Sequence, residues 1–274
     1  MHPATAIFLR AIAAAIAGGA IGLLAYRVRA LTRSGAYAAT ACGIVLYGAG
    51  GWPWAALVGA FFASSSALTR IEAPVTPARV HRRSAGRDSG ASQLHLGADA
   101  AAGECPRRAI RSPDYGGRHW HQVAANGGVA ALTACVYAVT GSRLALAAGA
   151  GAVAAATADT WATEVGRLGA ALPVLITTGA RVPHGTSGGV TPQGTAGAAA
   201  GALLIGATGA AFWSGAAWPF AIAVTLSGLS GAVLDSLLGA AVETRWGWIG
   251  NGVVNFTATV WGALAAVALV NRWA

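Results

Sequence analysis

The stretch AWPFAIAVTLSGLSGAVLDSLLGA, residues 217–240, decides the fold class of this chain. Its single charged side chain, that of Asp235, lies among residues that are otherwise apolar, small or hydroxylic. About 20 such residues in a helix cross the roughly 30 Å hydrocarbon layer of a bilayer. The stretch therefore predicts a transmembrane helix.

The composition of the whole chain agrees with this reading. Hydrophobic residues make up 55% of the 274 residues and charged residues only 10%, whereas about a quarter of the residues of a soluble domain are charged. This composition excludes an ordinary water-soluble domain. The 39 glycines and the many alanines predict closely packed helices, because small residues let helix backbones approach each other in lipid.

Apolar runs of membrane-spanning length recur along the chain, and we expect an all-α, polytopic integral membrane bundle of seven or eight helices. The predicted spans are residues 4–25, 35–50, 52–69, 123–141, 144–160, 192–213, 217–240 and 252–271. Eight spans is the preferred number. Residues 35–69 can form one broken helix or a tight hairpin at Gly50, Gly51 and Pro53, and the stretch 144–160 is short for a span, so seven spans also fit.

The distribution of arginine predicts the orientation of the bundle. All 18 basic residues are arginines, and Arg27, Arg29 and Arg33 follow the first span. The positive-inside rule places this loop in the cytoplasm and the N-terminus outside, in a multi-pass protein of the cell membrane. We expect the first span to be retained rather than cleaved as a signal peptide, because Arg10 lies early in it and no clean cleavage site follows.

The chain divides into N-terminal transmembrane helices (1–70), an Arg-rich cytoplasmic loop (71–117) and a transmembrane core (118–274). The loop is rich in Arg, Ser, Pro and Gly, so we expect it to be partly disordered. Its arginines lie in solvent and only keep the loop on the cytoplasmic side or, alternatively, they contact anionic lipid headgroups. The second interpretation uses Arg82, Arg83, Arg107, Arg108 and Arg111. We expect no nucleic-acid partner, because basic residues of a membrane protein report topology first.

Four carboxylates lie outside the Arg-rich loop, all at predicted cytoplasmic ends of spans. They are Asp159, Glu164, Asp235 and Glu243. A carboxylate inside the hydrocarbon costs on the order of 2.5 to 3.5 kcal/mol on insertion scales, and it is tolerated there when paired or bound. Their shared position therefore indicates a candidate site.

In ADTWATEVGRLG, residues 158–169, a helix places Asp159 beside Thr163, one turn away. Mg²⁺ takes one or two carboxylates together with phosphate oxygens and water. We therefore predict Asp159, Glu164 and Asp235 as catalytic residues and as ligands of Mg²⁺. The alternative is that arginines such as Arg167 neutralise acids at a helix end.

The loop VPHGTSGGVTPQGT, residues 182–195, precedes a predicted span. Its backbone N–H groups can form an anion nest next to the positive end of the following helix. The predicted phosphate-binding residues are Gly185, Thr186, Ser187, Gly188 and Gly189, with Arg181 as a charge partner. The loop does not match the Walker pattern, and an ordinary turn is the alternative.

Two amide-bearing motifs complete the candidate site. In GNGVVNF, residues 250–256, Asn251 and Asn255 are one helical turn apart, so they bind a nucleotide or a metal together or, alternatively, tie neighbouring helices. In GGRHWHQVAANGG, residues 116–128, we predict Arg118 as a phosphate clamp, with Gln122 and Asn126 as polar lining.

Several ordered motifs resemble the membrane family of domain of unknown function 92, which includes plant phytyl-phosphate kinase and animal transmembrane protein 19. The motifs are ADTWATEVG, P-x-LITT from Pro173 to Thr178, VPHGTSGGVTPQGT and VLDSLLGA. The resemblance runs from about Arg118 to Val270, with looser agreement in the first 70 residues. It departs from the family pattern at His119, where the family carries an acid, and in the loop, which has no lysine.

The resemblance implies a kinase of an isoprenoid (phytyl or polyprenyl) alcohol or monophosphate, using CTP or another nucleoside triphosphate with Mg²⁺. The matching family positions are Asp159, Glu164, Gly185, Thr186, Gly188, Gly189, Asp235, Ser236, Asn251 and Asn255. A transporter or lipid carrier is an alternative, although its acids are expected near the bilayer midplane. A cytidylyltransferase acting on a lipid phosphate is a third.

Overall fold

A computed structural model describes residues 3–71, 117–243 and 250–273 of the chain. Within these ranges the chain forms eight α-helices, one for each predicted span. They are α1 (Pro3–Arg27), α2 (Arg33–Val45), α3 (Trp52–Thr69), α4 (Trp120–Thr140), α5 (Arg143–Leu168), α6 (Pro192–Ala210), α7 (Ala217–Leu238) and α8 (Asn251–Trp273). The predicted all-α bundle is confirmed. Among the described residues, α4, α8 and the extended α7 (Ala217–Val242) are long and apolar enough to cross a membrane.

Two short π-helical turns lengthen the helices that they follow. The first, η1 (Leu46–Gly50), continues α2, and the second, η2 (Gly239–Glu243), continues α7. Between η1 and α3, Gly51 adopts a φ of +72°, which glycine tolerates because it has no Cβ. The stretch 35–69 therefore forms two separate helices, as the preferred eight-span prediction has it, and the alternative of one broken helix is wrong.

Helix α5 lies at the centre of the bundle and contacts α3, α4, α6, α7 and α8. Glycines allow this close packing. A Cβ on Gly262 of α8 would lie 2.5 Å from the carbonyl oxygen of Gly151, and one on Gly197 of α6 would lie 2.8 Å from the Cβ of Val165. The expectation that small residues bring the helices together is thus confirmed.

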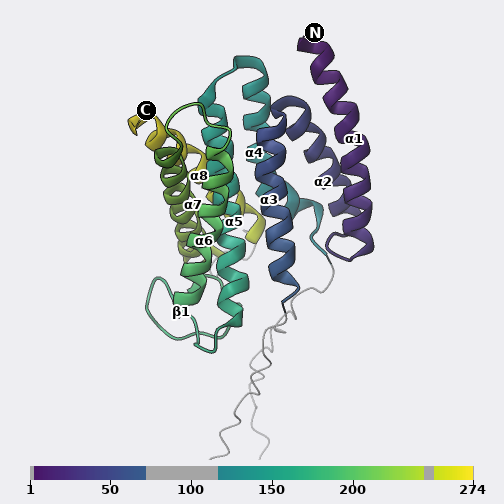
Figure 1. Cartoon of the computed structure of the whole chain (residues 1–274). Helices are drawn as coiled ribbons and strands as arrows, with labels where there is room; N and C mark the ends of the chain where they lie inside the picture. Colours follow the sequence, from purple (N-terminus) through teal and green to yellow (C-terminus); the bar gives the residue numbers. More distant parts are fainter. Residues whose placement is uncertain (1–2, 72–116, 244–249, 274) are drawn as a thin grey trace, which may run out of the picture. The chain divides into compact units, whose positions relative to one another are not determined.

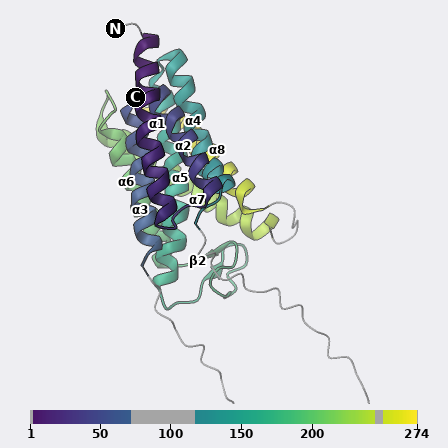
Figure 2. The ribbon, with the colours of Figure 1, turned by 90° about the vertical axis from the view of Figure 1, so that its right-hand side faces the viewer.

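The helices alternate in direction, which gives the bundle two distinct ends. We call the end where α1, α3, α5 and α7 finish the loop end, at the bottom of Figure 1. Helix α1 begins and α8 ends at the opposite side, which we call the terminal end (Figures 1 and 2). The Arg-rich loop predicted at residues 71–117 falls almost wholly outside the described residues. The orientation of the two ends in a membrane remains a prediction.

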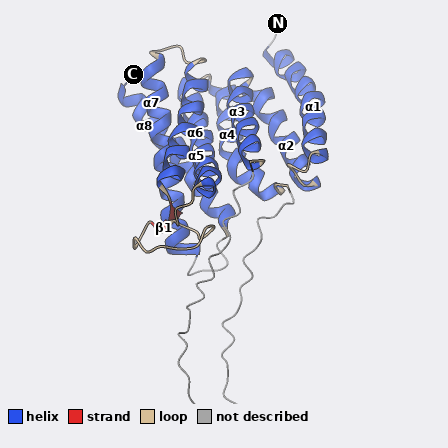
Figure 3. Ribbon diagram, turned by 60° about the horizontal axis from the view of Figure 1, so that its bottom comes forward, coloured by secondary structure: helices blue, strands red, loops and turns tan. Residues whose placement is uncertain are grey.

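A small antiparallel hairpin joins α5 to α6 at the loop end (Figure 3). Its two-residue strands are β1 (Val174–Leu175) and β2 (Gly189–Val190), with Val174 opposite Val190. The sequence predicts a loop here, because strands of two residues carry no alternating pattern. The hairpin places residues 185–189 beside the C-terminal end of α7.

Candidate functional site

A cavity of about 370 Å³ opens at the loop end between α5, α6, α7, the start of α8 and the β1–β2 connection. Its polar wall includes Asp159 of α5, Asp235 and Ser236 of α7, Asn251 of α8 and the loop residues 185–189. The consecutive segments α5, β1–β2 and α6 thus meet α7 and the start of α8 at one end of the bundle. Of the four acids whose shared position predicts a site, Asp159 and Asp235 line this cavity.

The carboxyl groups of Asp159 and Asp235 form a hydrogen bond with each other inside this cavity. Both residues are half-buried. Two negatively charged carboxylates in such contact would repel each other, so the pair either shares a proton or binds a cation. Hard oxygen ligands of this kind suit Mg²⁺. The pair is therefore the part of the cavity that can hold a divalent cation.

Two asparagines of α8 adjoin this pair. In the amide orientation that satisfies its hydrogen bonds, the side-chain nitrogen of Asn255 donates to Oδ2 of Asp235 at 2.9 Å and to Oδ1 of Asn251 at 2.7 Å. Such an orientation is assigned from the hydrogen-bond network. Asn251 and Asn255 thus lie in contact, and the bond from Asn255 to Asp235 ties α8 to α7, which was the alternative interpretation. Asn255 fixes the carboxylate of Asp235, while Asn251 lines the cavity.

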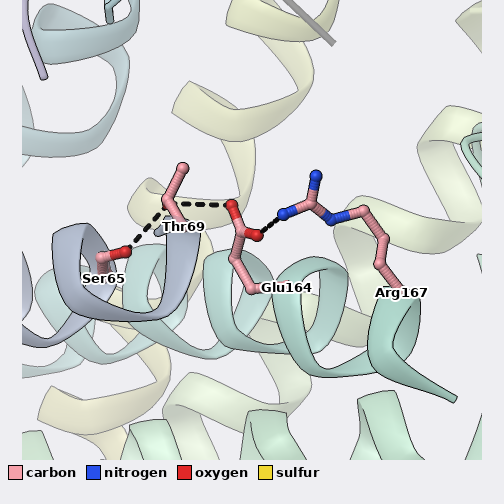
Figure 4. A network of polar contacts seen from close by, with 4 residues as sticks. All are labelled: Ser65, Thr69, Glu164 and Arg167. Atoms are coloured by element: carbon pink, nitrogen blue, oxygen red, sulfur yellow. Dashed lines mark hydrogen bonds and ion pairs between the residues drawn. The ribbon is translucent and has the colours of Figure 1, made fainter. Parts of the chain in front are cut away.

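Glu164 lies apart from the two aspartates. Its Oε1 accepts a hydrogen bond of 2.9 Å from the hydroxyl of Thr69, the last residue of α3, and its Oε2 forms an ion pair with Arg167 (Figure 4). Five positions along an α-helix rotate a side chain by about 140°, so Glu164 faces α3 while Asp159 faces α7.

The expected cluster of three carboxylates is therefore corrected. In the described ranges, no three His, Cys, Asp or Glu residues group so that they could hold a metal ion. Glu164 is neutralised by Arg167, which was the alternative interpretation of this segment. Glu243, the fourth acid, ends η2.

The glycine-rich loop adopts backbone conformations that need glycine. Gly185 has a φ of +85° and Gly188 a φ of +78°, which residues with a Cβ rarely adopt. Gly188 also packs against the end of α7, because a Cβ there would lie 2.7 Å from the carbonyl oxygen of Ser236. The close approach holds the loop over the cavity.

The loop offers fewer free donors than an anion nest requires. The N–H of Thr186 donates to the carbonyl of Pro183 at 3.3 Å, and the N–H of Gly189 donates to the carbonyl of Thr186 at 3.0 Å. The predicted nest of five consecutive N–H groups is thus only partly formed. The start of α6 adds the positive end of its helix dipole to the cavity wall. The N–H of Gly194 in its first turn already donates to the hydroxyl of the N-cap Thr191 at 2.9 Å.

The other predicted phosphate ligands lie outside the cavity wall. Arg118 lies over the ring of Phe61 at 5.7 Å, and burial lowers the pKa of its guanidinium from the ordinary value. Oε1 of Gln122 accepts a hydrogen bond from the N–H of His119 and caps α4. Asn126 is half-buried on α4, and Arg181 is exposed beside β1. The structure thus does not bring these four residues to the aspartate pair.

Sequence reasoning missed two parts of the wall. The first is Arg167, which is predicted from the sequence only as a partner of an acid but which lines the cavity. Asp159, Thr163 and Arg167 are four residues apart, and this helical spacing indicates that they lie on the same face of α5. The apolar inner wall is formed by Ala198 of α6 and by Leu229, Ala232 and Val233 of α7. No sequence signal distinguishes these four from ordinary packing residues.

Comparison with known proteins identifies relatives of the chain. The family model described as integral membrane protein DUF92 matches residues 16–263. The chain is 35% identical over 152 residues to an uncharacterized membrane protein of Methanocaldococcus jannaschii, covering 56% of this chain and 62% of that protein. It is 29% identical over 260 residues to Protein PGR of Arabidopsis thaliana, covering 85% of this chain and 79% of that protein. No solved structure matches.

Proposed function

The chain belongs to the DUF92 family of integral membrane proteins, and on that premise we propose that it is a nucleoside-triphosphate-dependent kinase of an isoprenoid alcohol or monophosphate. The reaction takes place at the loop end, which faces the cytoplasm. One observation carries the proposal: aspartates from two helices, Asp159 and Asp235, meet within a cavity that also has an apolar wall.

The mixed lining of the cavity supports an amphiphilic substrate. Its aspartates, amide and glycine-rich loop suit a polar head, whereas Leu229 and Val233 offer apolar surface. Val233 is also 49% exposed, and we infer that the apolar wall is open to the lipid around the bundle. A hydrocarbon tail can therefore stay among the helices while its alcohol or phosphate end reaches the aspartates.

Phosphoryl transfer suits the groups that line the cavity. The bond between the β–γ bridging oxygen and the γ-phosphorus of the donor breaks, and a nucleoside diphosphate leaves. The lipid oxygen that bonds to that phosphorus comes from a deprotonated phosphate or from a hydroxyl that releases its proton to water. This chemistry depends on placement and electrostatics more than on covalent help from the protein. Asp159 and Asp235 would hold Mg²⁺, which neutralises charge on the donor phosphates when bound. Asn255 keeps Asp235 oriented for this role.

The position of the acids favours the kinase over a transporter or lipid carrier. Acids on a transport pathway are expected near the bilayer midplane, whereas this pair lies in the loop-end halves of α5 (Arg143–Leu168) and α7 (Ala217–Leu238). A cytidylyltransferase acting on a lipid phosphate would use the same cation and nucleotide, but it releases pyrophosphate. The products distinguish these activities.

The test is a labelling assay with the purified full-length protein, Mg²⁺ and geranylgeranyl or phytyl monophosphate. Label from γ-³²P CTP or ATP should enter the lipid fraction as a diphosphate, whereas entry of the α-phosphate label would indicate a cytidylyltransferase. Asp159→Asn and Asp235→Asn should each lower the rate about 10²- to 10³-fold, because each removes charge from the site of phosphoryl transfer. Asp114→Asn, the same change in the Arg-rich loop, serves as the control. Equal product from all three variants would contradict the site.

A further inference from the structure

Arg167 is the arginine that reaches the cavity, within the ranges 3–71, 117–243 and 250–273. It lies in the last turn of α5, on the same wall as Thr163 and Asp159. A phosphate entering the cavity meets two aspartates, so it needs a cation on the other side. Arg118 and Arg181 do not line the cavity, so Arg167 is the described arginine placed for this role.

The side chain of Arg167 is held in place from α3. Its Nη2 pairs with Oε2 of Glu164, whose other oxygen accepts the hydrogen bond from Thr69 (Figure 4). The Glu164 side chain is only 13% exposed. A long cation fixed in this way loses less conformational entropy when a ligand binds.

The guanidinium still has donors for a ligand. A guanidinium carries five N–H groups in a planar fork, and the ion pair with Glu164 engages Nη2. The Nε of Arg167 is buried and has no hydrogen-bond partner in the described part of the chain. The other terminal nitrogen points away from Glu164 in Figure 4. Nε–H lies on the same edge of the guanidinium as Nη2, so the donors left for a ligand are those of the other terminal nitrogen.

We propose that Arg167 binds a phosphoryl group in the cavity, either that of the lipid monophosphate or that of the nucleotide donor. Glu164 and Thr69 are positioning residues for this arginine, and Glu164 is not a metal ligand. The inference rests on the proposed function and adds an anion-binding group to it. Paired N–H donors of arginine match phosphate oxygens in geometry and charge.

Equilibrium binding to the full-length protein in lipid nanodiscs tests this assignment. The probes are labelled geranylgeranyl monophosphate, labelled geranylgeraniol and a non-hydrolysable CTP analogue. Arg167→Gln should weaken the probe whose phosphoryl group it holds about 10- to 100-fold, because hydrogen bonds to a charged group are lost. Geranylgeraniol affinity should stay the same. Arg181→Gln, the same change at an exposed position outside the cavity, should alter none of the three affinities.

The Glu164→Gln variant tests the positioning role. It should weaken the same phosphate probe about 3- to 10-fold, because the arginine loses its orienting partner, while the Mg²⁺ concentration that gives half-maximal activity stays unchanged. A shift in that Mg²⁺ concentration would instead make Glu164 a metal ligand and would contradict the assignment. The double variant Glu164→Gln/Arg167→Gln leaves no unpaired charge, so geranylgeraniol binding by it shows that the fold survives.

The outcomes separate this inference from the kinase proposal. If the native protein binds a phosphate probe through Arg167 but forms no phosphorylated lipid, the anion site stands and the kinase proposal fails. If it forms product and Arg167→Gln keeps native affinity for both phosphate probes, the kinase stands and the anion site is wrong. If the native protein binds neither phosphate probe, both proposals are overturned.

Discussion

Arg143 and Arg167 mark the two ends of helix α5, and their surroundings differ. At the terminal end, Arg143 lies over the ring of Trp213 at 5.4 Å and donates a hydrogen bond of 3.1 Å to Ser214. At the loop end, Arg167 pairs with Glu164 and borders a cavity that holds two aspartates. The same residue type thus meets aromatic rings at one end and carboxylates at the other.

The terminal end has the features of a membrane interface rather than of a reaction site. A smaller cavity of about 170 Å³ there is lined by Arg143, Trp213, Phe220 and Trp273, among others. Trp213 stacks on Phe220 with ring centroids 4.6 Å apart. Aromatic residues with arginine typically anchor helices at the lipid headgroups. Carboxylates distinguish the two cavities, and the predictions below test whether function follows that difference.

The largest expected difference in the rate of lipid phosphorylation is between variants of two asparagines at opposite ends of α8. Asn255→Ala should lower the rate of lipid phosphorylation about 10- to 100-fold, because Asp235 loses the amide that orients it. Asn271→Ala at the terminal end, where Asn271 is exposed, should leave the rate unchanged. Steady-state labelling assays on both variants make the comparison. Equal losses would mean that the effect comes from helix stability and not from the site.

A smaller difference is expected between two glycines with positive φ. Gly188→Ala should cost about 1 to 2 kcal/mol from backbone strain, and its Cβ would also press on the carbonyl of Ser236. Gly141→Ala at the terminal end has a φ of +64° but meets no atom within 4 Å, so only the backbone strain applies. Thermal unfolding in detergent should show the larger shift for Gly188→Ala. Activity should fall in that variant alone.

The smallest effect is expected at Arg143 itself. Arg143→Gln removes the contact with the Trp213 ring, which contributes roughly 0.5 to 1 kcal/mol at an exposed site. We therefore expect a slight decrease in thermal stability and a native rate of lipid phosphorylation. A large loss of activity would show that the terminal end takes part in the reaction, which would remove the distinction between the two ends.

The helices could be predicted from the sequence because their signal is local. Each apolar run has enough length to be recognised by itself, and Gly51 with Pro53 indicated the break between α2 and α3. The meeting of Asp159 and Asp235 could also be predicted, since both acids end spans on the same side. Because successive helices run in opposite directions, residues at the same side of every second connection lie at one end of the bundle.

The rest of the site depended on tertiary packing. The partners of Glu164 could not be predicted from the sequence around it. Whether Glu164 faces α3 or α7 depends on how α5 is rotated in the bundle. Arg118 was predicted as a phosphate clamp from its chemistry, yet packing on Phe61 places it outside the cavity. The hairpin of β1 and β2 is fixed by contact with α7 and not by a pattern of its own.

Cross-linking between helices tests the contact of the two aspartates most directly. Native cysteines Cys42, Cys105 and Cys135 are first replaced by serine, and Asp159→Cys/Asp235→Cys is compared with Glu164→Cys/Asp235→Cys in native membranes. A short bis-methanethiosulfonate linker should join the first pair and not the second. Efficient linkage of the Glu164 pair, with none between positions 159 and 235, would contradict the site on which the proposed function depends.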